Sequence, residues 1–395
     1  MRTVIVNAAV ILPDRVIPRG GLVVEEGRIL HLFEGRAPAA VPGDRTIDAK
    51  GLYVSPGFVD IHTHGAGNAD FMDGSVEAVK TVCRTHLGFG TTSIVPSTLT
   101  STNEELFANL AHIESAAKTA EGMPEILGVH LEGPYFSPEQ KGAQDPRYLR
   151  NPDPGEYARL LEACPSIVRW TVAPELPGAL EMGRWLRKKR IVASIGHSNA
   201  VFEEVERACA NGYTLVTHLF NGMSRLVRKK AIMYLGVAES ALLLEELDVE
   251  IIADGKHLPP SLLKLIYKCK GPDKICLITD SIRAAGLDVK ESVLGSLANG
   301  QRVEIEDGVA YMPDRSSFGG SIATSNRLVR TMAQQAAVPL PEAVRMMSLT
   351  PARVMGVSDR KGSLERGKEA DIVAFDGDID VRLVMTRGRI QVDRL

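Results

Sequence analysis

The stretch Ser55-Pro-Gly-Phe-Val-Asp-Ile-His-Thr-His64 decides how the rest of the chain is organised. Its aromatic and β-branched residues favour a short buried strand that starts after Pro56-Gly57 and ends in a His-x-His motif. Side chains two positions apart on a strand point the same way, so His62 and His64 should project together from its end. Two imidazoles on one face can bind a divalent metal, although an isolated His-x-His motif also arises from unrelated surface histidines.

Segments with strand and helix patterns alternate after this stretch. Predicted strands follow at 91–95, 125–132, 167–173, 191–195, 214–218, 249–254 and 274–280. Predicted helices lie at 76–88, 103–120, 154–163, 180–189, 202–211, 260–270, 325–336 and 341–348. Eight strands separated by helical segments favour an α/β fold of the (β/α)8 barrel type, spanning residues 55–350.

The two ends of the chain have a different texture. Residues 1–54 and 351–395 alternate short strand patterns with turn signals such as Pro42-Gly43-Asp44 and Asp376-Gly377. We expect both ends to form one small β-sandwich domain. Residues 287–318 show strand and turn patterns without a helical period, which predicts an insertion after the eighth strand.

Composition narrows the kinds of molecule that the chain can be expected to bind. The chain has 395 residues, 44% hydrophobic and 24% charged, with a formal net charge of −3. That balance is ordinary for a globular protein and argues against nucleic-acid binding. No apolar run reaches the roughly 18 residues that span a membrane, and the N-terminal residues lack signal-peptide architecture. The five cysteines are scattered, as in reduced proteins, so we expect a cytoplasmic location.

Polar residues of one chemical kind end the predicted strands. They are His62, His64, Glu132, His197, His218 and Asp280, with His257 just after the seventh strand. The carboxyl ends of all barrel strands open onto one face, so these side chains should converge there. Imidazoles and carboxylates are the ligands of a hard-to-borderline divalent ion.

Two residues of this set also have a plainer interpretation, whereas His197 and His218 are better explained as ligands. Glu132 could be a structural carboxylate paired with Arg, and Asp280 could cap a following helix. His130 alternates with Glu132 along the strand and is expected in the barrel core. The alternative is that it supports a metal ligand through a direct contact. His86 is expected on a helix surface. Asp254, followed by Gly, is interpreted as a turn residue and left out of the site.

With these residues assembled, the chain resembles the amidohydrolase superfamily and, within it, the N-acetylglucosamine-6-phosphate deacetylases. The matching blocks are Pro56–Gly65, His130-Leu-Glu-Gly-Pro134, Gly196-His-Ser-Asn-Ala200, Thr217-His-Leu-Phe-Asn-Gly-Met223, Ile252-Ala-Asp-Gly-Lys-His257 and Ile278-Thr-Asp280. They occur in the same order and cover nearly the whole chain. The resemblance implies a (β/α)8 barrel with a β-sandwich built from both termini, and a homodimer.

The resemblance also implies roles for single residues. Glu132, His197 and His218 would hold the principal metal, and His62 and His64 match a variant that supports a second ion. Asp280 would be the general base and then the acid for the departing amine, while His257 would polarise the acetamide carbonyl. Asn221 and Gly222 match a segment that contacts the sugar phosphate. Zinc is the first expectation for the one or two ions, with Fe, Co or Mn as alternatives.

Two departures from the family pattern concern the substrate. Gln144 stands where the family typically has a His that reaches the phosphate in a neighbouring subunit. Arg228-Lys-Lys-Ala231 replaces an Arg-Glu-Pro-Gly segment. Arg228 and its basic neighbours keep an anionic substrate plausible, but a solvated charged face explains them equally well.

The expected reaction is therefore metal-dependent deacetylation of N-acetylglucosamine 6-phosphate to glucosamine 6-phosphate and acetate. An N-acetylgalactosamine 6-phosphate or an unphosphorylated N-acetyl sugar remains an alternative substrate. Two rival functions stay open as well: another amidohydrolase acting on a cyclic or linear amide, and a barrel that binds a metabolite without catalysis. The first rival often carries a carboxylated Lys at a strand end, and no Lys ends a predicted strand here.

Overall fold

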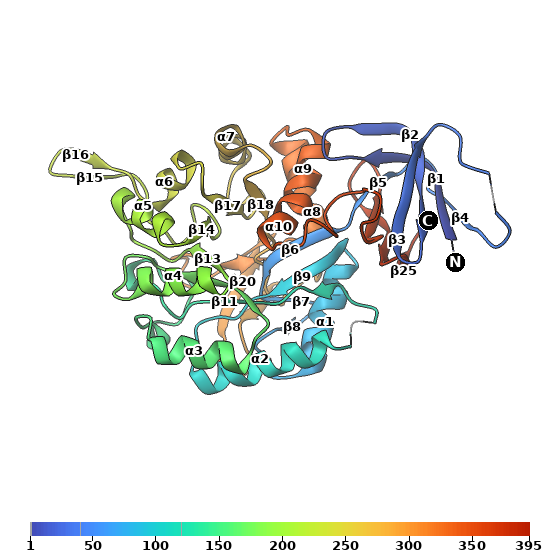
Figure 1. Cartoon of the computed structure of the whole chain (residues 1–395). Helices are drawn as coiled ribbons and strands as arrows, with labels where there is room; N and C mark the ends of the chain where they lie inside the picture. The colour runs from blue at the N-terminus through green and yellow to red at the C-terminus, as the bar shows by residue number, and fades with distance from the viewer. Residues whose placement is uncertain (1, 40, 120) are drawn as a thin grey trace.

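The structure, a computed structural model, describes residues 2–39, 41–119 and 121–395 (Figure 1). It is a mixed α/β protein in which parallel strands surrounded by helices form the larger part. A β-sheet made from both ends of the chain forms the smaller part, on one side of the molecule. The α/β class expected from the alternating pattern is confirmed.

The parallel strands form two sheets. One has the order β10-β9-β6 and the other β11-β12-β13-β14-β17-β18. Their bounds are β6 Phe58–Thr63, β9 Thr91–Pro96, β10 Glu125–Ile126, β11 Val129–Glu132, β12 Ile167–Val172, β13 Val192–Ile195, β14 Tyr213–Val216, β17 Asp248–Ile251 and β18 Ile275–Leu277. The predicted strand 125–132 is divided at Leu127-Gly128, because Gly128 has φ +147° and leaves the extended conformation.

Hydrogen bonds connect these two sheets at both of their edges. At one edge, Thr98 N donates to His130 O at 3.0 Å, and Ser97 forms a parallel bridge with His130. At the other, Asp280 N donates to His62 O at 2.9 Å. The ends of β6, β9, β11 and β18 therefore lie next to one another, although they are far apart in sequence.

Helices and short elements follow the strands. They are α1 Val76–Leu87, α2 Asn103–Ala117, α3 Pro154–Ala163, α4 Ala179–Lys188, α5 Phe202–Ala210, α6 Val237–Leu243, α7 Pro260–Lys270, α8 Ser325–Arg330, the π-turn η3 Thr331–Gln335, α9 Leu340–Met347 and α10 Leu349–Val354. Short pieces lie at β7 Gly65–Ala66, β8 Ala69–Asp70, η1 Pro138–Gln140 and η2 Pro146–Tyr148. A hydroxyl caps α2: Thr102 Oγ1 accepts from Glu105 N at 3.2 Å. The structure adds α6 and α10, whose six or seven residues are too short to show a helical period.

Both ends of the chain form one sheet with the order β25-β24-β23-β5-β1-β2-β3, and β4 pairs with β1. The strands are β1 Arg2–Ile11, β2 Val16–Glu25, β3 Arg28–Glu34, β4 Arg45–Asp48, β5 Tyr53–Pro56, β23 Ile372–Phe375, β24 Val381–Thr386 and β25 Arg389–Asp393. β5 joins the two ends, since it runs parallel to β1 and antiparallel to β23. Residues such as Leu22, Val54 and Leu383 form a core of this part, separate from the main core.

A cluster of ion pairs around Lys361 ties this sheet to the α/β part. The Lys361 ammonium, buried with a side chain 1% exposed, lies 3.1 Å from Glu125 on β10 and 2.8 Å from Glu369. Arg360 also pairs with Glu125, at 2.6 Å. These cations lower the pKa of Glu125 to about 2, since their effect exceeds that of burial, which raises it.

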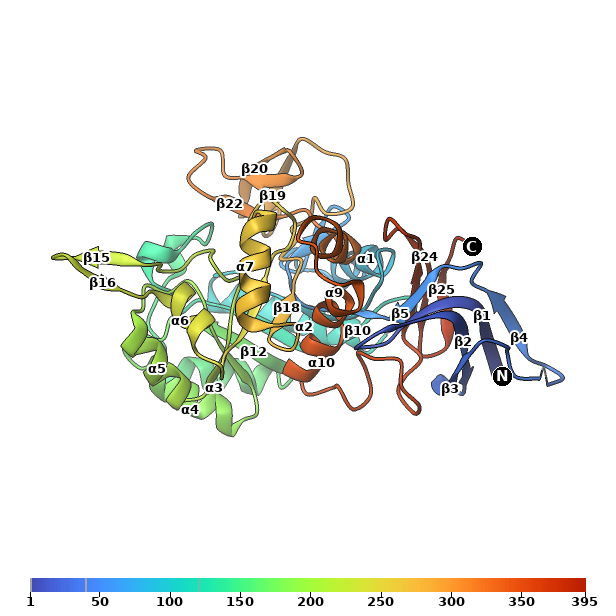
Figure 2. The same ribbon diagram turned by 90° about the horizontal axis from the view of Figure 1, so that it is seen from above.

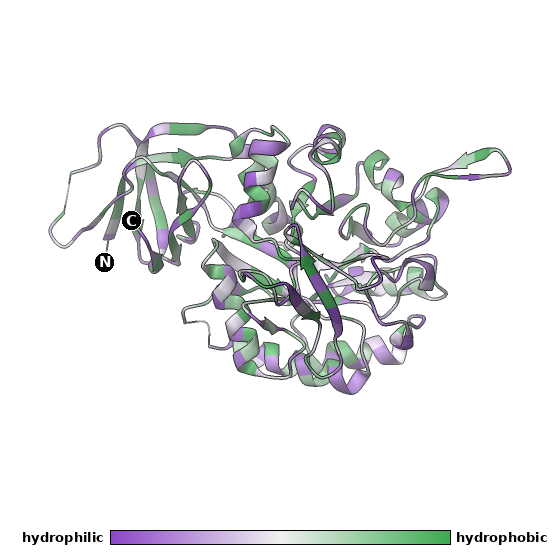
Figure 3. Ribbon diagram, turned by 180° about the vertical axis from the view of Figure 1, so that it is seen from behind, coloured by the Kyte–Doolittle hydropathy of each residue, from purple (hydrophilic) through white to green (hydrophobic). Residues whose placement is uncertain are grey.

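Two segments project from the α/β part. The predicted insertion forms a four-stranded antiparallel sheet of β19 Glu291–Leu294, β20 Gln301–Glu306, β21 Val309–Tyr311 and β22 Phe318–Ser321 (Figure 2). An unpredicted hairpin, β15 Val227–Lys229 with β16 Ile232–Tyr234, extends away from the body. Part of this hairpin is apolar in Figure 3, and Ile232 is 59% exposed.

All five cysteines are free thiols, and Cys83, Cys164 and Cys276 are buried. In the described ranges, none of the helices is long and apolar enough to cross a membrane.

Candidate active site

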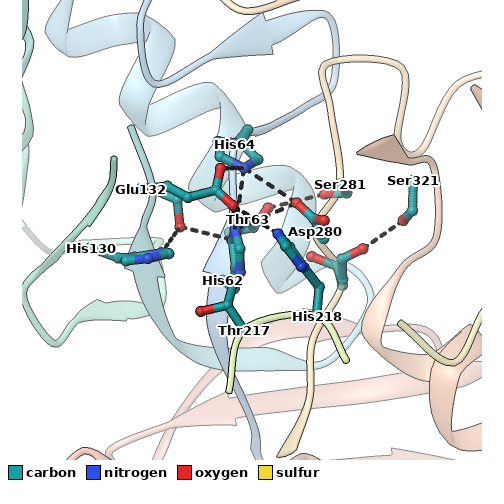
Figure 4. A network of polar contacts seen from close by, with 12 residues as sticks. His62, Thr63, His64, His130, Glu132, Thr217, His218, Asp280, Ser281 and Ser321 are labelled. Carbon is teal, nitrogen blue, oxygen red and sulfur yellow. Dashed lines mark hydrogen bonds and ion pairs between the residues drawn. The ribbon is translucent and has the colours of Figure 1, made fainter. Parts of the chain in front are cut away.

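The ends of five strands bring most of the predicted site residues into one buried cluster (Figure 4). Its members are His62, His64, Glu132, His197, His218 and Asp280. Glu132 Oε1 lies 3.0 Å from His218 Nε2 and 3.3 Å from His197 Nε2. On the other side, His64 Nε2 lies 3.4 Å from Glu132 Oε2 and 3.2 Å from Asp280 Oδ1. Glu132 therefore stands between two pairs of imidazoles.

The backbone at three of these positions is strained. His197, His218 and Asp280 have φ of 49°, 31° and 45°, a region that residues other than Gly seldom adopt. Each lies two or three positions beyond the last residue of a parallel strand, where the left-handed turn redirects the side chain into the cluster. Such strain persists only when surrounding contacts hold it, and it is concentrated at functional sites.

Hydrogen bonds determine which ring nitrogen faces the cluster. His197 Nδ1 lies 2.8 Å from the carbonyl oxygen of Gln140, which can only accept, so Nδ1 carries the proton. His62 Nδ1 lies 3.3 Å from Glu250 Oε2, and the same argument applies to that carboxylate. In both rings the unprotonated Nε2 then faces the other ligand atoms, which is the arrangement that a metal requires.

Two groups of three side chains fit a divalent ion. They are His62, His64 and Glu132, and Glu132, His197 and His218, each with its ligand atoms within 4.8 Å of one another. All five side chains are buried. Imidazole nitrogens that face one another at 3.2–3.3 Å make sense as a preformed set of donors for a cation. Glu132 belongs to both groups, so it is the residue on which one ion or two would depend.

The charges in the cluster shift the pKa of its members. Burial raises the pKa of Glu132 and of Asp280, but the neighbouring histidines lower both well below their ordinary values. Burial lowers the pKa of His64, but its hydrogen bonds to the carboxylates of Asp280 and Glu132 outweigh burial and raise the value to about 10. The two carboxylates are thus ionised at neutral pH and available as ligands or as a base.

His257 lies beyond the end of β17 and faces the same pocket. Its Nδ1 lies 2.8 Å from Asp254 Oδ2, and its ring packs on Phe318 of β22 at 4.5 Å between centroids. Asp254 Oδ1 also accepts from the backbone N–H groups of Lys256 and His257. The interpretation of Asp254 as a turn residue outside the site was therefore incomplete, because its second oxygen orients the His257 ring.

A pocket of about 120 Å³ opens onto the cluster. The predicted residues that line it are His64, Glu132, Gln144, His197, His218, Asn221, Gly222, His257 and Asp280. Gly222 has φ +54°, and a Cβ there would lie 2.9 Å from His197 Nδ1, so only glycine fits this wall. None of the lining residues in the described chain is Lys or Arg.

Gln144 and Arg228, the two departures from the family pattern, lie in different places. Gln144 is buried beside the cluster, where Nε2 donates to Glu132 Oε2 at 2.7 Å and Oε1 accepts from Thr100 N at 2.9 Å. Arg228 lies on the exposed hairpin, outside the pocket of its own chain, with Nε 3.4 Å from Met233 Sδ.

Two other histidines belong to the interior. His130 is buried, with Nδ1 2.9 Å from Ser97 Oγ and Nε2 2.7 Å from Thr171 Oγ1, as expected for a core histidine. The prediction that His86 lies on a helix surface was wrong. It is 0% exposed and its Nε2 lies 3.1 Å from Thr63 Oγ1, because α1 turns this side chain toward the strands.

Sequence reasoning missed Arg169 and Glu250. Arg169 stands in Ile-Val-Arg-Trp-Thr-Val and Glu250 in Asp-Val-Glu-Ile, so each is a charge between two apolar neighbours in a strand. A charge at such a position is costly unless it is paired, which was the available signal. In the structure the two side chains form an ion pair inside the strand layer.

The family profile of the Amidohydrolase family matches residues 53–391. The chain is 32% identical to the N-acetylglucosamine-6-phosphate deacetylase of Haemophilus influenzae, over 98% of this chain and 99% of the relative. It is 30% identical to the N-acetylgalactosamine-6-phosphate deacetylase of Escherichia coli O157:H7, over 93% of this chain and 97% of the relative.

Solved structures agree with these relatives. The N-acetylglucosamine-6-phosphate deacetylase of Pasteurella multocida superposes with a TM-score of 0.92 at 30% identity, over 100% of both chains. A mutant of the Mycobacterium smegmatis enzyme in complex with N-acetyl-D-glucosamine-6-phosphate gives a TM-score of 0.90 at 30% identity, over 99% of both chains.

The chain thus belongs to the amidohydrolase family and is an amide hydrolase. Its likeness to the H. influenzae and P. multocida proteins extends over nearly the whole chain. Within the family it is a member of the N-acetylglucosamine-6-phosphate deacetylases, which confirms the resemblance found in the sequence. A barrel that binds a metabolite without catalysis is no longer a serious alternative.

Proposed function

We propose that the protein hydrolyses the acetamide of N-acetylglucosamine 6-phosphate, releasing acetate and glucosamine 6-phosphate. The observation that carries the proposal is the cluster itself: Glu132, His197 and His218 meet within ligand distance of one another, and Asp280 lies beside them at the pocket. Relatives with this activity cover almost the whole chain.

Glu132, His197 and His218 would hold the principal ion, and His62 with His64 would share Glu132 with a second. Such an ion supplies Lewis acidity, which makes water a stronger nucleophile at neutral pH. We infer zinc first, with Fe, Co or Mn as alternatives, since imidazole and carboxylate donors suit all of them.

The other residues then move protons and hold the substrate. Asp280, ionised and next to the ligands, accepts the proton of the attacking water and returns it to the nitrogen of the departing amine. His257 donates from Nε2 to the acetamide oxygen as negative charge develops there, while Asp254 holds its Nδ1. Asn221 and Gly222 form the wall that would contact the sugar phosphate.

The second candidate substrate is N-acetylgalactosamine 6-phosphate. It is favoured by the E. coli O157:H7 relative, whose identity to this chain is within 2% of the H. influenzae value. The side chain of Gln144 donates a hydrogen bond to the proposed metal ligand Glu132. In this chain other groups would therefore contact the substrate phosphate.

The test is an acetate-release assay with N-acetylglucosamine 6-phosphate, N-acetylgalactosamine 6-phosphate and N-acetylglucosamine. We expect the highest kcat/KM for the first, and a loss of at least about 100-fold for Asp280→Asn. Equal rates on the phosphorylated and unphosphorylated sugars would refute the phosphate requirement. An unaltered Asp280→Asn rate would remove Asp280 as the base.

Homodimer formation is part of this proposal, and the hairpin supports it. Leu226, Val227, Ile232 and Met233 are all exposed apolar residues on or beside β15–β16, and exposed apolar patches mark protein–protein contacts. Arg228 on the same hairpin would serve the pocket of a second copy, which has no Lys or Arg among its described lining residues. Mixing Arg228→Ala with Asp280→Asn protein should then restore part of the activity that each lacks.

We also infer the finer architecture. The hydrogen bonds between the β9 and β11 ends, and between the β6 and β18 ends, support closure into a (β/α)8 barrel over residues 55–350. The separate core of the terminal sheet supports a β-sandwich of residues 1–54 and 351–395. Reduced cysteines support a cytoplasmic location. Fractionation of cells that express the tagged full chain would test the location.

A further inference from the structure

An ion pair crosses the interior directly behind the ligand cluster. Arg169 on β12 and Glu250 on β17 are both 0% exposed. The guanidinium contacts both carboxylate oxygens, with Nη2 2.7 Å from Glu250 Oε2 and Nη1 in a closer contact with Oε1. The bidentate geometry is the strongest that this pair of side chains can form.

A buried pair of this kind needs an explanation. Removing two charges from water is costly, and apolar side chains of similar size often pack as well or better. The interior of a parallel-strand layer is normally filled by branched apolar residues. The neighbours of Glu250 in β17, Val249 and Ile251, are apolar and fully buried as well. Stability alone therefore does not account for the pair. We look for its explanation in the groups that it holds in place.

The remaining contacts of the pair point to β6. Arg169 Nη1 donates to the carbonyl oxygen of Ile61 at 3.0 Å, and Nη2 donates to Thr217 Oγ1 at 3.0 Å. Glu250 Oε2 lies 3.3 Å from His62 Nδ1. The pair thus contacts both the backbone immediately before His62 and the His62 ring, and it also contacts the residue immediately before His218.

The other sides of the His62 ring are also held. His130 meets it edge-to-face at 4.6 Å between centroids and is itself tied by Ser97 and Thr171. His62 Nε2 then lies 3.3 Å from His64 Nε2 and 3.5 Å from Glu132 Oε1. With Nδ1 donating to Glu250, Nε2 presents its lone pair to the ligand cluster.

We propose that Glu250, neutralised and oriented by Arg169, is a positioning residue that fixes the tautomer and the ring plane of His62 for metal binding. The inference rests on the proposed function only in taking His62 as a ligand. Without the carboxylate, the ring proton can move to Nε2, or the ring can rotate. Either change removes the Nε2 lone pair that would bind the metal. Loss of such a partner lowers metal affinity by about 10- to 100-fold.

The test is a double-mutant cycle on metal affinity, measured by Co²⁺ titration of metal-free protein and visible absorption. We expect Glu250→Gln to weaken Co²⁺ binding about 10- to 100-fold, and to have no further effect in a His62→Ala background. Asp248→Asn is the matched control, since it breaks a different ion pair, with Arg353 at 2.7 Å, at the other end of β17. It should leave Co²⁺ affinity within twofold.

A second variant covers misfolding of Glu250→Gln, which leaves Arg169 unpaired. The double variant Arg169→Met with Glu250→Met replaces the pair by apolar side chains and should fold, while its Co²⁺ affinity falls as in Glu250→Gln. An equal loss with and without His62 would overturn the proposal, and so would unchanged affinity. Parent protein that binds Co²⁺ but releases no acetate would refute the proposed function alone.

Discussion

Replacing Asp254 by Asn tests the chemistry at His257 without touching a predicted metal ligand. Asn Oδ1 can keep the two backbone hydrogen bonds from Lys256 and His257, at 2.8 and 2.9 Å. Only the oxygen that faces His257 Nδ1 changes, from a charged acceptor to an NH₂ donor. The ring then loses the acceptor that orients its Nδ1–H, because an NH₂ group cannot accept that hydrogen bond.

The magnitude follows from the charge of the acceptor that is lost. A hydrogen bond to a charged group contributes about 1.5–3 kcal/mol, and one between neutral groups about 0.5–1.5 kcal/mol. Loss of the carboxylate that holds Nδ1 should therefore weaken the stabilisation that the His257 ring gives to the developing oxyanion by about 1.4 kcal/mol, which is roughly tenfold in kcat/KM. We expect kcat to fall with little change in KM, because the interaction strengthens in the transition state.

The assay is acetate release at saturating metal, with metal content and Tm measured alongside. Asp248→Asn is again the matched control, as the same substitution at the opposite end of β17. A second check is the His257→Asn background, in which Asp254→Asn should add nothing. Activity within twofold of the parent, or an equal loss in that background, would refute the role assigned to Asp254.

Three further predictions follow from single contacts. Gly222→Ala places a Cβ 2.9 Å from His197 Nδ1 at φ +54°, so we expect KM to rise and Tm to fall by an amount equivalent to about 1–2 kcal/mol. The ionised Glu125 stabilises the parent protein above pH 4.5, and this stabilisation is lost as the pH falls from about 4.5 to 2. Glu125→Gln should therefore lower the free energy of unfolding at neutral pH by about 1–2 kcal/mol after solvent screening, and the Tm values of parent and variant should converge as the pH falls. Gln144→Leu frees Glu132 Oε2 from its 2.7 Å hydrogen bond, and Co²⁺ titration should show severalfold weaker binding, which unchanged affinity would contradict.

Strand-end residues were predictable because their signal is local. Glu132, His197 and His218 each follow an apolar strand, and the parallel arrangement of such strands requires their ends to meet. The helices of nine or more residues were predictable for a similar reason, since the apolar period of α1 or α5 is written in its own residues.

Contacts between side chains of different elements could not be predicted from such local patterns. The pairing of Arg169 with Glu250 joins residues 81 positions apart, and the burial of His86 depends on which face of α1 meets the strands. The position of the hairpin around Arg228, away from its own pocket, has no local signature either.

The sequence by itself determined the alternation of strands and helices, the ligand types and their order along the chain. Only the tertiary structure decided that Asp254 orients His257, that Glu250 meets His62 and that Gln144 holds Glu132. The physical reason is that periodicity reports which way a side chain points along its own element. Its hydrogen-bond partner depends on the register and distance of another element, which packing of the whole chain sets.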